Sequence, residues 1–434
     1  MLAILITLDC VRADVLEEDS GLTPRLDALA PEWTTFTQAF AQSQNTLGSH
    51  LSMLSSNYLF QHGVYSNFSR KGLPPHALTR RLADLGWDCR AFTSADFLAL
   101  LLGNQVGRPD PRFPPAENRS IAARLARRYW GHRSPASVTL DRGLKWLKSA
   151  KRKGDAFLWM HLFDAHMAYE APAVFLRQHV RAGRLVENTL REQVAEKGWF
   201  SPDFPEYDWT VPLELFPERY RAAVAYQDDR LGAFFDGLKA AGQWEDALIF
   251  VTADHGECLL GDHGVYCAHK KLFDTTVRVP LRVKFPKGLH AGEHVDAMVQ
   301  HVDLAPTVAS LAGFEDPLYA GRDLRAVASG ADPGHETVFA EHVDNFVRAV
   351  RDRDWIYTER VPGSENKWGL AMEGGNLFRR DGIPAPEAEP VHRPRLKKAM
   401  EAVLSSGAEA RSAWGSEQAA DGESSKRLQE LGYM

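Results

Sequence analysis

Apolar residues along the chain come in short, nearly unbroken runs that alternate with stretches of helical periodicity. The clearest runs are "LAILITL", "AFLWMHLF" and "ALIFVTA". Continuous apolar runs are typical of strands covered on both faces, and their alternation with helices indicates a mostly parallel sheet between helical layers. The pattern therefore predicts an α/β fold with strands at 2–8, 156–163 and 247–253.

The stretches between these runs predict helices. In "SVTLDRGLKWLKSA", apolar residues recur at helical spacing, and Ser137 or Thr139 stands where a cap residue is expected. "RYRAAVAYQDDRLGAFFDGLKAAG" is amphipathic and ends at Gly242, a typical helix stop. Residues 170–217 are instead rich in Pro, Trp, Phe and charge. Because long irregular segments inside a domain are often functional, we expect this one to cover a site.

After residue 313 the pattern changes to that of a small antiparallel sheet. "ETVFAEH", "FVRAVRD" and "DWIYTER" have the composition of short strands in hairpin order. We expect a catalytic domain over 1–330 and a smaller C-terminal α+β subdomain over 331–434. Within the latter, the Ser-, Ala- and Gly-rich composition of 404–424 predicts poor order, and "SSKRLQELGYM" predicts a terminal helix.

Composition and charge narrow the choice of partners. The 434 residues, 44% hydrophobic and 25% charged, are those of an ordinary globular protein. A formal net charge of -6 argues against nucleic acid or an anionic membrane as the main partner. The chain opens without a signal-peptide pattern and holds no apolar run of membrane-spanning length, so we expect a cytoplasmic protein. Oligomeric state is not visible in the sequence.

The ends of the predicted strands carry the candidate chemistry. Asp9 follows the first strand, and Asp254 and His255 follow a later one. In parallel sheets, ligands bind at the carboxyl ends of the strands, which share one edge. Two carboxylates and an imidazole held there would repel one another unless a cation joined them. We expect one divalent ion, Ca²⁺ or Mn²⁺, with Mg²⁺ or Zn²⁺ as alternatives. The rival interpretation is that these residues only cap helices or bond loop amides.

The segment "AQSQNTLGSHLSML" supplies a candidate nucleophile. "LGSHLSML" would begin a helix, whose free amides favour an anionic group. Thr46 precedes it, and a threonine hydroxyl becomes an effective nucleophile when a metal lowers its pKa. Ser49 and His50 fall one turn later, where they could orient the nucleophile or donate to the substrate. The alternative is that Thr46 is only the N-cap of this helix.

Eight motifs follow one another along the chain. They are "ILITLDCVRADVL", "TPRLDALA", "TLGSHLSML", "FDAHMAYEAP", "VTADHGECLLGDHG", "LFDTTVRVPLRV", "HVDLAPTV" and the terminal "LQELGYM". In combination and order they resemble those of the sulfatase family, which belongs to the alkaline phosphatase superfamily. The resemblance spans nearly the whole chain and is weakest over 170–217 and 345–424. It implies an alkaline-phosphatase-like α/β/α sandwich and a metal-dependent ester hydrolase.

The resemblance assigns metal ligands. Family members bind one divalent cation through acidic residues after the first strand and after the strand of the DHG motif, which here implies Asp9, Asp254 and His255. Thr46 stands at the nucleophile position, where it would also contact the metal. Many sulfatases have a second Asp where this chain has Cys10. Cys10 is therefore either a further ligand or merely a buried residue.

The resemblance also assigns residues that hold the anionic group of the substrate. His166 and Lys270 match a histidine and a lysine that the family uses for this purpose. Near rivals or supporting residues are His269, Lys271 and His263. His161 lies inside its strand, and we expect it to face the core.

Two departures from the family pattern favour phosphoryl over sulfuryl transfer. Common sulfatases convert the Cys or Ser of a C/S-x-P-S-R motif into formylglycine, whereas this chain has "TLGSH", and threonine cannot be converted. The Lys-x-x-His pattern after the "LGW"-type turn is also missing. Formylglycine expels sulfate by collapse of a hemiacetal, an exit that an alkyl sulfate lacks. A phosphorylated threonine, in contrast, can be hydrolysed by water.

The sequence thus predicts a metal-dependent hydrolase of a small anionic ester, with phosphate mono- or diesters preferred. Three alternatives stay open. They are a true sulfatase that works without formylglycine, a catalytically silent anion-binding homologue, and a transferase that passes the phosphoryl group from Thr46 to another acceptor.

Overall fold

The computed structural model describes most of the chain. The residues outside the description are 18–19, 68, 70, 96–97, 100–101, 103–105, 107–133, 150–153, 168, 181–214, 264, 343–346, 362–375 and 407–434. Most of the expected cover segment therefore lies outside the described residues, as do the expected terminal helix and nearly all of the segment expected to be poorly ordered.

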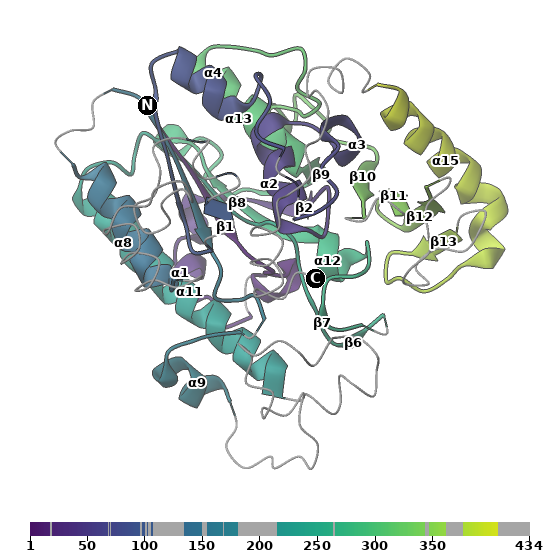
Figure 1. The fold of residues 1–434 in the computed structure, drawn as a ribbon, viewed down its shortest axis with the longest axis horizontal. Helices are drawn as coiled ribbons and strands as arrows, with labels where there is room; N and C mark the ends of the chain where they lie inside the picture. The colour runs from purple at the N-terminus through teal and green to yellow at the C-terminus, as the bar shows by residue number, and fades with distance from the viewer. Residues whose placement is uncertain are drawn as a thin grey trace.

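A seven-stranded sheet forms the centre of the first domain, in the order β3-β4-β1-β5-β8-β2-β9 (Figure 1). Only β8 runs antiparallel to its neighbours. This confirms a mostly parallel sheet and all three predicted strands. The strand bounds are β1 (Leu2–Leu8), β2 (Thr34–Phe40), β3 (Asp88–Thr93), β4 (Ala156–Leu162), β5 (Ala247–Ala253), β8 (Arg278–Lys284) and β9 (His294–Gln300).

The register of the central strands aligns their carboxyl ends. Strand β1 lies between β4 and β5, and Leu8 pairs with Leu162 on one side and with Ala253 on the other. Every residue of these three strands is buried, as their unbroken apolar runs predict. Because the strands end level with one another, Asp9 and Asp254 enter the same edge of the sheet.

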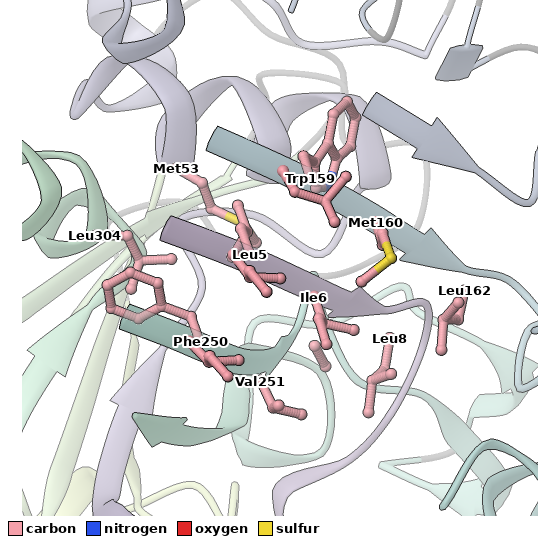
Figure 2. Close-up of a cluster of buried hydrophobic side chains, with 14 of the residues drawn as sticks. Leu5, Ile6, Leu8, Met53, Trp159, Met160, Leu162, Phe250, Val251 and Leu304 are labelled. Atoms are coloured by element: carbon pink, nitrogen blue, oxygen red, sulfur yellow. The ribbon is translucent and has the colours of Figure 1, made fainter. Parts of the chain in front are cut away.

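Helices cover both faces of the sheet. One face carries α2 (Thr46–Ser55), α4 (Leu78–Asp84) and α13 (Leu304–Ala312), and the other carries α8 (Ala136–Leu147) and α11 (Phe216–Ala240). Figure 2 shows Met53 of α2 and Leu304 of α13 on the side of Leu5 and Phe250. Successive strand residues point to opposite faces, so Ile6 lies on the side of α8.

Of two predicted helix boundaries, one is wrong and the other is confirmed. Helix α8 has Pro135 as its N-cap with no side-chain cap bond, so Ser137 and Thr139 lie inside the helix and the predicted cap is wrong. Helix α11 ends at Ala240, and Gly242 follows with a φ of 65°, as the predicted stop requires. The other short helices that the structure describes in this domain are η1 (Ala13–Val15), α1 (Pro24–Asp27), η2 (Ala30–Glu32), α3 (Leu59–His62), α9 (Ala173–His179), α12 (Asp274–Val277), η5 (Pro286–Gly288), η6 (His301–Asp303) and α14 (Leu324–Ala328).

Two smaller sheets complete the fold. The hairpin β6 (Cys258–Asp262) and β7 (Val265–Ala268) follows the carboxyl end of β5. The C-terminal sheet is antiparallel in the order β10 (Val338–Glu341), β11 (Val347–Arg351), β12 (Trp355–Arg360), β13 (Asn376–Arg379). It confirms the three predicted strands and adds β13, while η7 (Pro386–Ala388) and α15 (Glu389–Ser405) follow it. The boundary at residue 330 stays a prediction. Within the described ranges, no helix combines the length and the apolar character needed to cross a bilayer.

Candidate active site

Helix α2 presents the Thr46 hydroxyl to the carboxyl edge of the sheet. Its N-cap is Asn45, whose Oδ1 accepts the Gly48 amide at 3.2 Å, so the alternative that Thr46 is the cap is wrong. The hydroxyl oxygen of the fully buried Thr46 instead lies 3.4 Å from His255 Nε2. Because capping does not engage this hydroxyl, it is available for chemistry.

The amides in the first turn of α2 are less available than the sequence suggests. The Leu47 amide donates to Asn67 Oδ1 at 3.0 Å, and Asn45 takes the Gly48 amide. The expectation that free amides at this helix start hold the anion is therefore wrong for these two groups. The Ser49 hydroxyl donates to the Ser43 carbonyl at 2.9 Å, which steadies the loop before the helix.

Asp9, Asp254 and His255 gather at the ends of β1 and β5, as predicted. One ligand atom of each lies within 4.8 Å of the others, and all three residues are buried. Asp254 Oδ1 accepts the amides of Cys10 and His255, at 3.2 and 2.8 Å. Among the described residues, Asp9 Oδ1 and Asp254 Oδ2 find no hydrogen-bond donor. Buried carboxylate oxygens are costly without a partner, so this donor set fits a divalent metal ion.

Electrostatics agree with that fit. Burial and the nearby charge of Asp9 raise the pKa of Asp254. Burial lowers the pKa of His255, but the carboxylates of Asp254 and Asp9 outweigh it and hold this pKa above its ordinary value. His255 Nδ1 lies 2.9 Å from the Gly256 carbonyl. A carbonyl only accepts, so Nδ1 carries a hydrogen, and Nε2 is the ring atom that faces Thr46.

Two further histidines, His50 and His161, position Thr46 and Asp9 through hydrogen bonds. His50 Nδ1 donates to the Thr46 carbonyl at 2.7 Å, and its Nε2 lies 2.9 Å from Thr7 Oγ1. Burial lowers the pKa of His50 to about 3, so it stays neutral. With both nitrogens engaged, His50 positions Thr46, and the structure does not support the expected role as a donor to the substrate.

His161 belongs to the site, although the sequence suggested only a core position. It is fully buried, and its Nε2 lies 3.0 Å from Asp9 Oδ2. Burial lowers its pKa to about 4, so the neutral ring donates to Asp9. Strand parity finds it once the register is known, because His161 pairs with Thr7 and therefore shares the face of Asp9, two residues on.

The residues expected to hold the anion approach from the loops. His166 contributes a nitrogen within 4.8 Å of ligand atoms of Asp9 and Cys10, and His269 does so for Cys10 and His255. The His166 ring stacks on Phe163 with 4.4 Å between centroids. Both imidazoles therefore lie at the rim of the carboxylate cluster.

Lys270 and His263 are two further residues expected to hold or support the anionic group. The Lys270 carbonyl is 3.3 Å from His342 Nε2. Burial lowers the pKa of His342, and the positive charge of Lys270 lowers it further. His263 packs 4.5 Å from the Phe273 ring, in a pocket that the C-terminal sheet helps to form. Within the described chain, His263 makes no contact with the carboxylate cluster.

Comparison with known proteins decides the family. The sulfatase family model matches residues 2–314, which include every site residue named above except His342. The chain belongs to the sulfatase family. The uncharacterized sulfatase YidJ of Escherichia coli is 23% identical over 368 residues, which cover 77% of this chain and 72% of that protein. An ulvan-active sulfatase of Formosa agariphila is 22% identical over 375 residues, covering 79% and 68%.

Solved structures agree on the fold. The phosphonate monoester hydrolase of Agrobacterium radiobacter superposes with a TM-score of 0.68 at 19% identity, and the match covers 96% of each chain. This sulfatase-family protein therefore has the alkaline-phosphatase-like fold and is a hydrolase of phosphoric or sulfuric esters. Family members generally depend on a divalent metal, which the Asp9 cluster could hold.

Glu257 is a buried acid of this sulfatase-family site that sequence reasoning missed. It follows the DHG motif directly, is 1% exposed, and its Oε1 lies 3.6 Å from His269 Nδ1. Burial raises its pKa to about 7. Its position one residue after the motif was the available signal, because the chain has not yet left the edge of the sheet there.

A cavity of about 200 Å³ opens beside His166 and offers room for the alcohol part of an ester. Its wall includes Phe163, Asp164, Glu170 and Tyr226. Burial raises the pKa of Asp164 to about 7. Because His166 lines this cavity and also lies close to Asp9 and Cys10, the cavity adjoins the site of this sulfatase-family hydrolase.

Proposed function

We propose that this sulfatase-family hydrolase cleaves phosphate esters, mono- or diesters, through Thr46 as the nucleophile. The observation that carries the proposal is the Thr46 hydroxyl itself, which is not used as a cap and lies 3.4 Å from His255 Nε2 beside two buried carboxylates. The sequence offers no residue at this position that could become formylglycine. Threonine suits attack on phosphorus better than on sulfur, because its phosphoryl ester can be released by water.

The proposed reaction has two steps, both at Thr46. Thr46 Oγ1 forms a bond to phosphorus while the bond from phosphorus to the ester oxygen breaks, and the alcohol leaves with a proton. Water then attacks phosphorus, and Thr46 regains its hydroxyl as phosphate departs, or as a phosphate monoester departs when the substrate is a diester. A bound divalent ion would lower the pKa of the hydroxyl and stabilise negative charge on the phosphoryl oxygens, by several kcal/mol.

The surrounding groups position these atoms. His50 fixes the Thr46 backbone, and His161 holds the Asp9 carboxylate in the direction of the cluster. We expect His166, His269 and Lys270 to hold the phosphoryl oxygens, because both imidazoles lie beside the cluster and the positive charge of Lys270 acts on His269. Loss of one such donor should slow turnover by about 10²-fold.

Matched aryl esters test the proposal. An aryl phosphate, an aryl phosphate diester and an aryl sulfate are offered to metal-loaded wild type, Thr46→Ala and Thr46→Ser. We expect a phosphate ester to be the best substrate of wild type, activity to vanish in Thr46→Ala, and part of it to return in Thr46→Ser. Preferential turnover of the sulfate would contradict the choice of phosphate, and equal turnover by Thr46→Ala would contradict the nucleophile.

A further inference from the structure

Cys10 is held in an unusual backbone conformation directly after β1. Its φ is 62°, a left-handed value that few residues other than glycine adopt. The Cys10 amide donates to Asp254 Oδ1 at 3.2 Å, and its carbonyl accepts the Tyr220 hydroxyl at 2.9 Å. These bonds enforce the conformation, and strained residues of this kind gather at functional sites. The side chain is fully buried, with Sγ 3.9 Å from His255 Nδ1.

The Cys10 sulfur is the shared member of two groups of possible ligand atoms. In one group it lies within 4.8 Å of atoms of Asp9 and His166, and in the other within 4.8 Å of atoms of His255 and His269. These imidazoles follow β4, β5 and β7, so three separate segments bring a nitrogen to one thiol. The Asp9 carboxylate, at the end of β1, also lies near this sulfur.

Asp9 Oδ1, a buried oxygen near this sulfur, has no hydrogen-bond partner in the described part of the chain. Glu257 Oε1 and His269 Nδ1 make no hydrogen bond there either, and contact each other only at 3.6 Å. Glu257 is 1% exposed, and its carboxylate interacts with the Cys10 thiol. Unpaired acceptors this deeply buried are costly. A cysteine that served only to fill space would not require them around it.

We propose that Cys10 is a ligand of the divalent cation in this site, and that it makes the site selective for Zn²⁺ over Ca²⁺ and Mg²⁺. Thiolate and imidazole donors favour zinc, whereas calcium and magnesium take oxygen donors. On binding, a bond forms from Sγ to the metal and the thiol proton goes to solvent. The proposal rests on the cation site of the proposed function, but not on which ester that site cleaves.

Cys89 is the matched control. It is also buried, in β3, but its Sγ donates to the Thr79 carbonyl at 3.6 Å. A Cys89→Ser variant therefore removes a buried thiol without touching the cluster around Cys10. Cys10→Ser keeps the size of the side chain and removes the soft donor, and Cys10→Asp replaces that donor with a carboxylate.

Cobalt substitution gives a readout that does not depend on activity. Co²⁺ is added to the metal-free protein, and the near-ultraviolet band that reports charge transfer from a thiolate to cobalt is recorded. We expect the band in wild type and Cys89→Ser and its loss in Cys10→Ser. Stoichiometric cobalt binding by wild type without the band, or an unchanged band in Cys10→Ser, would overturn the proposal.

A competition between Zn²⁺ and Ca²⁺, followed by calorimetry, tests the selectivity and stays decisive if Cys10→Ser fails to fold. Wild type should prefer zinc. In Cys10→Asp, zinc affinity should fall by about 10–100-fold, the scale on which residues of a metal site act, while calcium affinity rises. The same preference in both proteins would refute a role for Cys10. Failure of the phosphate proposal would show only in the ester assay and would leave both metal readouts unchanged.

Discussion

Asp164 should make the stability of this protein depend on pH in a defined window. Its carboxylate is buried between α8 and α11, where Oδ1 accepts the Ala136 amide at 3.1 Å and Oδ2 accepts from Gln227 Nε2 at 3.3 Å. Burial raises its pKa from the ordinary 3.8 to about 7, despite these two bonds. The folded protein thus keeps the proton over a range in which the unfolded chain has lost it.

The sign and size follow from that difference. Between pH 3.8 and about 7 the folded state binds more protons than the unfolded state, so the free energy of unfolding falls as pH rises. Each pH unit is worth about 1.4 kcal/mol. The full cost of the ionised carboxylate is therefore at most about 4.5 kcal/mol, and it is present above pH 7.

Asp164→Asn should remove this cost. The new side chain keeps an oxygen for the Ala136 amide, and Gln227 Oε1, which has no partner among the described residues, can accept from the new amide once Gln227 turns over. We expect the variant to match wild type near pH 4 and to exceed its unfolding free energy increasingly up to pH 8, in urea titrations. Asp141→Asn, at an exposed carboxylate on α8, is the control for loss of charge. A stability difference that does not change with pH would refute the reasoning.

Three further predictions concern the site and its support. Thr46→Ala should lower kcat for the ester by several orders of magnitude, whereas Thr46→Ser should keep measurable turnover, in steady-state assays. His161→Phe removes the donor to Asp9 and should weaken metal binding about 10–100-fold in calorimetry, with partial rescue by His161→Gln; equal affinities would contradict its role. In Gly143→Ala, a Cβ would stand 2.4 Å from Met160 Sδ, so unfolding free energy should fall by about 1–3 kcal/mol in urea. Unchanged stability there would contradict the packing of α8.

The sequence predicted those features that depend on local pattern. The three central strands were legible because their apolar runs are buried on both faces, and the level ends of parallel strands brought Asp9 and Asp254 together as expected. Parallel geometry alone turns a residue's place after a strand into a place in space. The C-terminal strands could also be predicted, since each is a short apolar run between turns.

Side-chain partners distant in the sequence could not be predicted. The Asn67 side chain accepts a hydrogen bond from the Leu47 amide of α2, twenty residues earlier, and no local sequence pattern predicts this bond. Asn45, and not Thr46, is the N-cap, because the backbone is still extended at Asn45 and the helix begins at Thr46. His161 is buried in its strand, as the sequence suggested, but its contact with Asp9 becomes visible only when the strand register is known.

The central claim is that Thr46 carries the phosphoryl group during turnover, and trapping that species tests it most directly. Metal-loaded protein is mixed with an aryl phosphate, quenched in acid within the first turnover, and digested for peptide mass spectrometry, with Thr46→Ala in parallel. The account predicts one phosphoryl group on the peptide that contains Thr46 in wild type and none in the variant. Rapid turnover with no phosphorylated Thr46, or a phosphoryl group at the same yield in Thr46→Ala, would contradict it.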